Sequence, residues 1–87
     1  MKKIILDFSG VPEKRLHDYL AEKFSFPAHY GKNFDALYDL LTEISSPVCV
    51  GVFNTEGKNF SPLIQVLKDA EQDNKNLCVV FSKLELN

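Results

Sequence analysis

The sequence predicts a small α/β fold in which a three-stranded parallel sheet packs with about three helices. Three stretches rich in β-forming residues alternate with segments whose apolar residues recur every three or four positions. Strands that alternate with helices pair in parallel, because the helix supplies the long crossover that a parallel pair needs. The 87 residues are expected to form one domain over 1–87, since a second core would not fit. The sequence leaves the strand order open.

The first half of the chain is expected to hold one strand and two helices. The strand is predicted at 2–8, where β-forming residues dominate. Pro12 suits the first turn of a helix whose apolar residues recur at helical spacing, at Leu16, Tyr19, Leu20 and Phe24. Pro27 ends that pattern, and Gly31 permits a turn. Asn33 is a favourable N-cap for a second helix, whose apolar side consists of Phe34, Leu37, Leu40, Leu41 and Ile44.

The second strand is predicted at 48–53, which is apolar almost throughout. A continuous apolar run is typical of a parallel strand covered on both faces, so both faces of the sheet are expected to be covered. Cys49 and Cys78 lie in apolar runs and match no metal-ligand spacing. Both are therefore predicted to be buried, reduced thiols, which pack like small apolar side chains.

The last part of the chain is expected to hold a loop, a helix and a strand. Residues 54–60 are mostly polar and read as a loop. Ser61 is predicted to cap a third helix, because a proline follows it at the first helical turn. The helical pattern fades at Asn74, and the last strand is expected at 77–81, or as far as Leu84.

The acidic residues are unevenly distributed. Residues 1–32 carry a net charge of +2, residues 33–57 carry −4 with no Lys or Arg, and residues 58–87 balance to zero. One acidic block in a chain whose net charge is only −2 predicts a local anionic surface. Such a surface disfavours direct binding to nucleic acid, whose phosphates would repel it, and favours a cationic protein partner.

The N-terminal region lacks the pattern of an export signal. Ile4, Ile5 and Leu6 are followed at once by Asp7, so no signal-peptide apolar segment forms. The longest later apolar run, 48–53, is too short to span a bilayer. The chain is therefore expected to be cytoplasmic and to have no contact with membranes.

The second predicted helix carries its charges on one side. The polar side consists of Asp35, Tyr38, Asp39, Thr42 and Glu43. Asp35 and Asp39 are four residues apart and repel each other as neighbours on one face. They suit a plain solvated face, in which Asp35 also gains from the helix dipole. They equally suit a protein interface, because His29, Tyr30 and Tyr38 lie beside them, and aromatic groups anchor interfaces that charges orient.

A longer motif favours the interface. Residues 26–42 read Phe26-Pro27-Ala28-His29-Tyr30-Gly31-Lys32-Asn33-Phe34-Asp35-Ala36-Leu37-Tyr38-Asp39-Leu40-Leu41-Thr42. This run resembles the barstar family of intracellular inhibitors of the ribonuclease barnase. Residues 64–70 resemble the last helix of that family more weakly. The order of predicted strands and helices also agrees over nearly the whole chain.

The resemblance implies a binding mode. In the family, the loop and the following helix enter the ribonuclease cleft, where acidic side chains occupy the phosphate sites. Asp39 matches the family's dominant carboxylate, Asp35 a second acid in the cleft, and Asp69 a peripheral acid. The implied contact residues are His29, Tyr30, Gly31, Asn33, Asp35, Tyr38, Asp39, Thr42, Glu43 and Asp69. The expected partner is a basic extracellular or toxin ribonuclease, bound 1:1 by a monomer.

The sequence departs from the family pattern at several interface positions. His29 stands where the family has a tyrosine, and Tyr38 stands where it has a tryptophan. Glu43 replaces a glycine and Ile44 a second tryptophan, and the loop at 54–60 is shorter. The resemblance therefore does not specify which ribonuclease is bound.

Other functions remain open from the sequence. His17, His29 and the aspartates could form an acid–base or metal site, but no nucleophile or oxyanion motif accompanies them. The sequence therefore favours a protein that is not an enzyme and needs no cofactor or metal. Two further alternatives are an immunity protein against a delivered toxin nuclease and a barstar-like adaptor that binds another basic protein.

Overall fold

The protein is described by a computed structural model that covers residues 2–55 and 60–82. The elements in chain order are β1 (Lys2–Asp7), the 3-10 turn η1 (Glu13–Arg15), α1 (Leu16–Phe24), α2 (Phe34–Thr42), β2 (Val48–Phe53), α3 (Ser61–Asp73) and β3 (Leu77–Ser82). The three strands form one parallel sheet in the order β1-β2-β3. The predicted α/β fold is thus confirmed. Residues 56–59 of the predicted loop and the extension to Leu84 lie outside the described residues.

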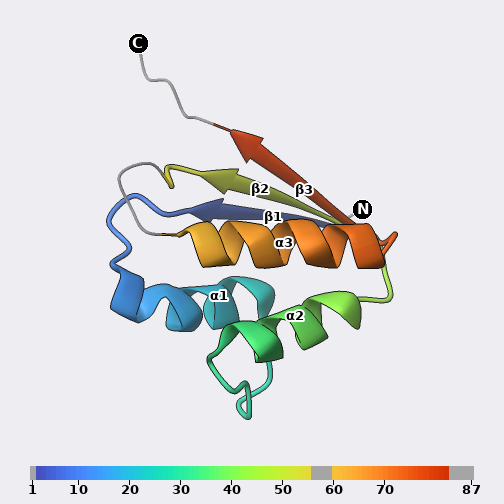
Figure 1. Ribbon diagram of the computed structural model, residues 1–87, viewed down its shortest axis with the longest axis horizontal. Helices are drawn as coiled ribbons and strands as arrows, with labels where there is room; N and C mark the ends of the chain where they lie inside the picture. The colour runs from blue at the N-terminus through green and yellow to red at the C-terminus, as the bar shows by residue number, and fades with distance from the viewer. Residues whose placement is uncertain (1, 56–59, 83–87) are drawn as a thin grey trace.

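All three helices lie on the same side of the sheet, where α1 and α3 contact strands and α2 packs against α3 (Figure 1). Each crossover joins a strand to its next neighbour in the same direction across the sheet, first from β1 to β2 and then from β2 to β3. Two crossovers of the same hand that step in the same direction lie on the same face. The strand order therefore places the helical layer on one side only.

The prediction that both faces of β2 are covered was wrong. Side chains along β2 alternate between buried and half-buried, with Val48, Val50 and Val52 facing the helices. The apolar character of the other positions does not come from a second helical layer. We call the uncovered side of the sheet the open face; it carries Ile5 and Val80, which are 53% and 49% exposed.

The prediction of two buried thiols was also wrong for the same reason. Cys49 and Cys78 both lie on the open face, where Cys49 is half-buried and Cys78 is exposed. Both are free thiols in this structure. An apolar neighbourhood in the sequence indicates a strand, but it does not tell which face of the sheet is covered.

The core lies between the sheet and the three helices. Its largest fully buried side chains are Phe8, Phe60, Leu6, Leu20, Leu37, Leu41, Leu63, Leu67, Val50 and Val52. Each such side chain contributes roughly 1.5–3 kcal/mol through removal from water. Leu37 and Leu41 are the two residues of this set on α2, and they hold that helix in one orientation.

Two predicted helix starts differ from the observed ones. The segment after Pro12 opens with the 3-10 turn Glu13–Arg15 before α1 begins at Leu16. Ser61 was predicted as a cap, but it is the first residue of α3, and Phe60 occupies the N-cap without a side-chain hydrogen bond. Phe60 is 1% exposed, so its burial, not a polar cap, fixes where this helix begins.

Candidate interface on α2 and α3

The turn before α2 is built around Asn33. Its side-chain oxygen accepts a hydrogen bond from the Ala36 amide at 2.7 Å, so the predicted N-cap is confirmed. The left-handed residue of this turn is Lys32, with φ of 54°, and not Gly31. A Cβ at Gly31 would lie 3.3 Å from Asn33 Nδ2 and 3.4 Å from the Ala36 Cβ, a tight fit that a shift of a few tenths of an ångström in these side chains would relieve.

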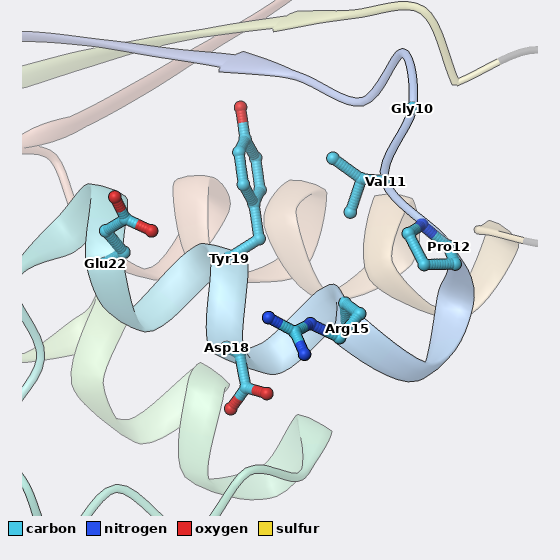
Figure 2. Close-up of a pocket in the computed structure, with 7 residues that line it drawn as sticks. All are labelled: Gly10, Val11, Pro12, Arg15, Asp18, Tyr19 and Glu22. Atoms are coloured by element: carbon cyan, nitrogen blue, oxygen red, sulfur yellow. The ribbon is translucent and has the colours of Figure 1, made fainter.

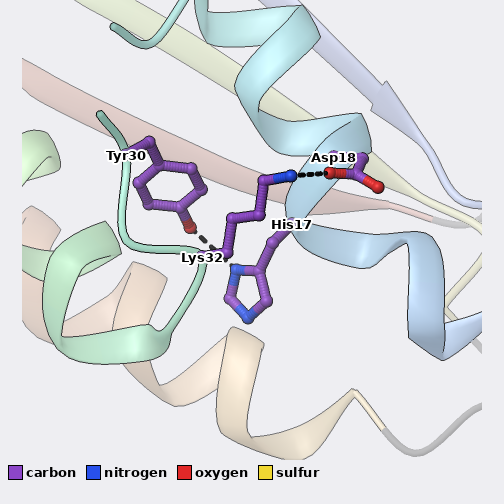
Figure 3. Close-up of polar contacts among 4 residues, drawn as sticks. All are labelled: His17, Asp18, Tyr30 and Lys32. Carbon is purple, nitrogen blue, oxygen red and sulfur yellow. Dashed lines mark hydrogen bonds and ion pairs between the residues drawn. The ribbon is translucent and has the colours of Figure 1, made fainter. Parts of the chain in front are cut away.

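Side-chain contacts to α1 hold the same loop in place (Figure 3). Tyr30 is only 6% exposed, and its hydroxyl lies 2.7 Å from His17 Nδ1. The His17 ring packs edge-on against Phe34, with centroids 4.9 Å apart. Asp18 and Lys32 form an ion pair at 2.8 Å. The loop that leads into α2 is therefore tied to α1 at two successive α1 residues.

The pKa values of this cluster indicate its charge state. Burial raises the pKa of Tyr30 to about 12. Burial also lowers the pKa of His17, outweighing the nearby charge of Asp18, which acts to raise it. At neutral pH both groups are therefore uncharged, and the tautomer of His17 decides whether its Nδ1 accepts from the Tyr30 hydroxyl or donates to it. The hydrogen bond and charge of Lys32 lower the pKa of Asp18.

The outward side of α2 carries exposed carboxylates. Asp35, Asp39 and Glu43 are all exposed, while Leu37 and Leu41 on the opposite side are fully buried. Among the described residues the ion pair found is the one between Lys32 and Asp18, so Asp35 and Asp39 have no ion-pair partner there. Two unpaired negative charges are thus fixed one helical turn apart on a well-packed support.

A second pair of acids comes from α3. Asp69 and Asp73 are exposed and also four residues apart, and Gln65 Nε2 donates to Asp69 Oδ1 at 2.9 Å. The hydroxyl of Tyr38 on α2 donates to Asp73 Oδ2. This hydrogen bond raises the pKa of Tyr38, with smaller contributions from burial and from the charges of Asp73, Asp69 and Asp39. Acids from two helices therefore gather around one tyrosine.

We call the set Asp35, Asp39, Asp69 and Asp73 the acidic surface. The sequence reasoning missed Asp73. The signal was present, because Asp73 follows Asp69 by four residues, the same spacing that marked Asp35 and Asp39. What the sequence could not show is that Tyr38 brings the two pairs together across the contact between α2 and α3.

The C-terminal end of α2 is held by Asn74, which is 7% exposed. Its side-chain amide donates to the carbonyls of Leu41 and Ile44, at 2.9 and 3.0 Å, and its oxygen accepts from the Asn76 amide at 3.0 Å. The Leu41 carbonyl also accepts from the Ile44 amide at 3.4 Å, and the Ile44 carbonyl also accepts from Asn76 Nδ2 at 3.4 Å, so Asn74 adds to the bonds at this helix end. Asn74 thereby links the ends of α2 and α3, a role that its place at the end of a helical pattern did not reveal.

The predicted contact residues fall into three groups by exposure. The exposed ones are His29, Gly31, Asn33, Asp35, Asp39, Glu43 and Asp69. Tyr38 and Thr42 are half-buried, and the Thr42 hydroxyl donates to the Asp39 carbonyl at 3.0 Å. Tyr30 is buried. The structure places these residues along one loop, α2 and the adjacent side of α3; their contact with a partner stays a prediction.

A small pocket lies elsewhere, beside the β1–α1 connection (Figure 2). Its volume is about 220 Å³, and it is lined by Gly10, Val11, Pro12, Arg15, Asp18, Tyr19 and Glu22. None of these residues belongs to α2 or α3. The volume is below the roughly 300–1,000 Å³ typical of sites for drug-sized ligands, so the acidic surface is the better candidate for function.

Residues 2–55 and 60–82 contain neither a metal-site cluster nor a membrane-spanning helix. No group of three or more His, Cys, Asp or Glu side chains there is arranged to hold a metal ion. None of the helices described is long and apolar enough to cross a lipid bilayer.

Comparison with known proteins points to inhibitors. A family model described as Barstar (barnase inhibitor) matches residues 1–84. The "Putative ribonuclease inhibitor YrdF" of Bacillus subtilis (strain 168) is 34% identical over 86 residues, an alignment covering 87% of this chain and 92% of the relative. Both matches confirm the predicted resemblance. Both descriptions also name inhibitors, which confirms the prediction that the chain is not an enzyme.

Proposed function

The chain belongs to the Barstar (barnase inhibitor) family, and we propose that it inhibits a ribonuclease by placing α2 and its preceding loop in the enzyme's basic active-site cleft. One observation carries the proposal. Asp35 and Asp39 are exposed and have no ion-pair partner among the described residues, on a helix whose other side is fixed in the core. Fixed, unpaired negative charge is what a cationic cleft would bind.

The chemistry of a ribonuclease explains the fit. Such an enzyme binds a polyanion and stabilises charge on a transferring phosphoryl group, so its cleft is lined with cationic side chains. An inhibitor needs negative groups at phosphate-like positions and enough surrounding surface to exclude water. Because Leu37 and Leu41 already hold α2 in place, little conformational freedom remains to be lost on binding. The mutual repulsion of the acids in the free protein is relieved by the partner's cations.

In this proposal the residues of the acidic surface have different roles. Asp39 makes the central contact with the enzyme's phosphate-binding Arg and catalytic His, and Asp35 makes a second contact within the cleft. Asp69 and Asp73 extend the negative potential toward the rim, where charge steers association more than it adds affinity. Buried Tyr30 acts by positioning the loop through His17.

The remaining predicted contacts form the border of the interface. His29, Gly31 and Asn33 present the loop, Tyr38 and Thr42 lie beside the central acids, and Glu43 adds a third carboxylate at the C-cap of α2. The proposed complex is 1:1 between a monomeric inhibitor and a basic ribonuclease, secreted or delivered as a toxin. The proposed location is the cytoplasm, where the inhibitor protects cellular RNA.

The test is calorimetric titration with a small basic microbial ribonuclease, together with an RNA-cleavage assay. Asp39→Ala is expected to weaken binding by about 2–5 kcal/mol, the range for truncating one member of a desolvated charge pair, for which barnase–barstar is itself a reference case. Glu22→Gln is the matched control, because Glu22 is an exposed acid on α1. It should leave affinity and inhibition unchanged.

The outcomes separate the mechanism from its alternatives. Tight 1:1 binding that stops RNA cleavage and is lost in Asp39→Ala supports cleft insertion. An affinity change below tenfold in that variant would sink the assignment of Asp39. High salt should slow association far more than it speeds dissociation. Inhibition of a delivered toxin nuclease, with no effect on secreted ribonucleases, would identify the immunity form of the same mechanism.

A further inference from the structure

The open face of the sheet carries a pair of thiols side by side. Cys49 on β2 and Cys78 on β3 are direct partners in the parallel register. Both are expected on the side of the sheet away from the helices, since the residues on either side of each cysteine are buried in the core. This placement was not visible in the sequence, in which the two cysteines are far apart.

The spacing of strands brings the pair within reach of a covalent bond. Neighbouring strands lie about 4.7–4.9 Å apart, and disulfides join residues whose Cα atoms are about 4.4–6.8 Å apart. A hydrogen bond between the two thiols, in which the protonated Cys78 donates to Cys49, is the largest cause that raises the pKa of Cys78. Within the described residues β3 is an edge strand of the sheet and pairs with β2.

We propose that Cys49 and Cys78 form a reversible redox modification site, which closes to a cross-strand disulfide when it meets a low-molecular-weight disulfide. The site is independent of the acidic surface, because it lies on the face of the sheet that the helices do not cover. The proposal therefore stands or falls separately from ribonuclease inhibition.

The disulfide forms in two thiol–disulfide exchange steps, and the different exposure of the two thiols sets which one reacts first. Cys78 is exposed and Cys49 half-buried, so the Cys78 thiolate attacks a sulfur of the small disulfide. A mixed disulfide forms on Cys78, and one small thiolate leaves. The Cys49 thiolate then attacks the Cys78 sulfur, forming the cross-strand bond and releasing the second small thiolate. The two protein thiols are oxidised, their protons pass to the two released thiolates, and the small disulfide is reduced.

Neighbouring groups make the exchange slow but not unfavourable. The charge of Glu71 and partial burial add to the hydrogen bond in raising the pKa of Cys78, which lowers its thiolate fraction at neutral pH. The raised pKa of Cys78 slows its attack on the small disulfide. It does not change the equilibrium advantage that Cys49 has from lying next to Cys78. An exposed cross-strand bond also remains accessible to reducing thiols, as labile disulfides are.

The experiment equilibrates the full chain in mixtures of reduced and oxidised glutathione, with and without guanidinium. Mass spectrometry after acid quenching separates the internal disulfide from glutathione adducts. The effective concentration of one thiol at the other is expected to be at least tenfold higher in the folded chain than in the chain unfolded by guanidinium. By thermodynamic linkage, the ratio of the effective concentrations in the folded and unfolded chain equals the factor by which the disulfide stabilises the folded state. A tenfold ratio should therefore raise Tm by about 5–10 °C. Dithiothreitol should reverse both effects.

Serine variants test the order of attack. Cys49→Ser should stop at a single glutathione adduct on Cys78, whereas Cys78→Ser should react much more slowly. Stable adducts on both cysteines of the wild type, or disulfide-linked dimers in place of the internal bond, would overturn the proposal. An effective concentration no higher in the folded chain than in guanidinium would overturn it as well, and that comparison needs no variant.

Discussion

The acidic surface and the open face are both exposed, but they are exposed for different reasons. The acidic surface consists of charged side chains on two helices whose opposite sides are buried, and its Asp35 and Asp39 have no ion-pair partner among the described residues. The open face carries mainly apolar side chains and thiols, with Lys3 as the register partner of Cys49, on strands that the helices cover from one side only. Unpaired charge on a fixed support points to a partner, whereas the apolar character of the open face follows from the β-forming residues of a one-sided sheet.

The sharpest test of this contrast uses neighbouring residues on β1. Leu6 is fully buried and Ile5 is 53% exposed on the opposite face. Leu6→Ala should lower the free energy of unfolding by about 2–5 kcal/mol, because it removes core contacts and leaves a cavity. Ile5→Ala should cost less than about 1 kcal/mol. Urea unfolding measures both. Similar losses in the two variants would mean that the open face is covered.

A smaller loss of stability is expected where α2 is fastened to α3. Asn74→Asp keeps the acceptor for the Asn76 amide but removes both bonds donated to the carbonyls of Leu41 and Ile44. The free energy of unfolding should fall by about 1–3 kcal/mol, because two hydrogen bonds are lost and a carboxylate then faces the two carbonyl oxygens. The control is Asn76→Asp, which loses one bond of 3.4 Å to the same Ile44 carbonyl. Equal losses would contradict the role assigned to Asn74.

A weaker effect is expected from pH at the loop beside the acidic surface. Burial lowers the pKa of His17 in the folded protein, so folding favours the neutral form. Stability is then fully present above the unfolded pKa, near 6.5, and is lost as pH falls through the lower folded pKa. Urea midpoints at pH 7.5 and 5 should differ less in His17→Gln than in the wild type. An unchanged difference would exclude His17 as the cause.

The smallest effect is spectroscopic. The hydrogen bond to Asp73 is the largest cause that raises the pKa of Tyr38. Asp73→Asn should therefore lower the pKa of Tyr38 toward its ordinary value, as measured by ultraviolet titration of the phenol. Asp18→Asn, which removes an acid on α1, should leave that titration unchanged. If both variants behave alike, Tyr38 does not join the acids of α2 and α3.

Much of the fold followed from local patterns. The three strands and three helices lie close to their predicted positions, because period-2 and period-3.6 repeats of apolar residues report which sides of an element are buried. Asn33 caps α2 as predicted, since capping depends on a side chain and an amide three residues apart. The acids at positions 35 and 39 share one face for the same local reason.

Contacts between distant segments could not be predicted in this way. The bond from Tyr38 to Asp73 spans 35 residues, and the contact of Tyr30 with His17 turns a predicted interface tyrosine into a buried support for the loop. The left-handed turn at Lys32 also escaped prediction. A lysine there carries no sequence signal, whereas the adjacent glycine does, although the φ of Gly31 is not in the left-handed region.

The amino-acid sequence by itself therefore determined the elements, the cap of α2 and the spacing of its acids, because each depends on residues within a few positions of one another. The tertiary structure alone decided the strand order, and with it much else. Because β1, β2 and β3 follow one another across the sheet, both crossovers lie on one face, α2 meets α3, and Cys49 stands beside Cys78 on the face left open.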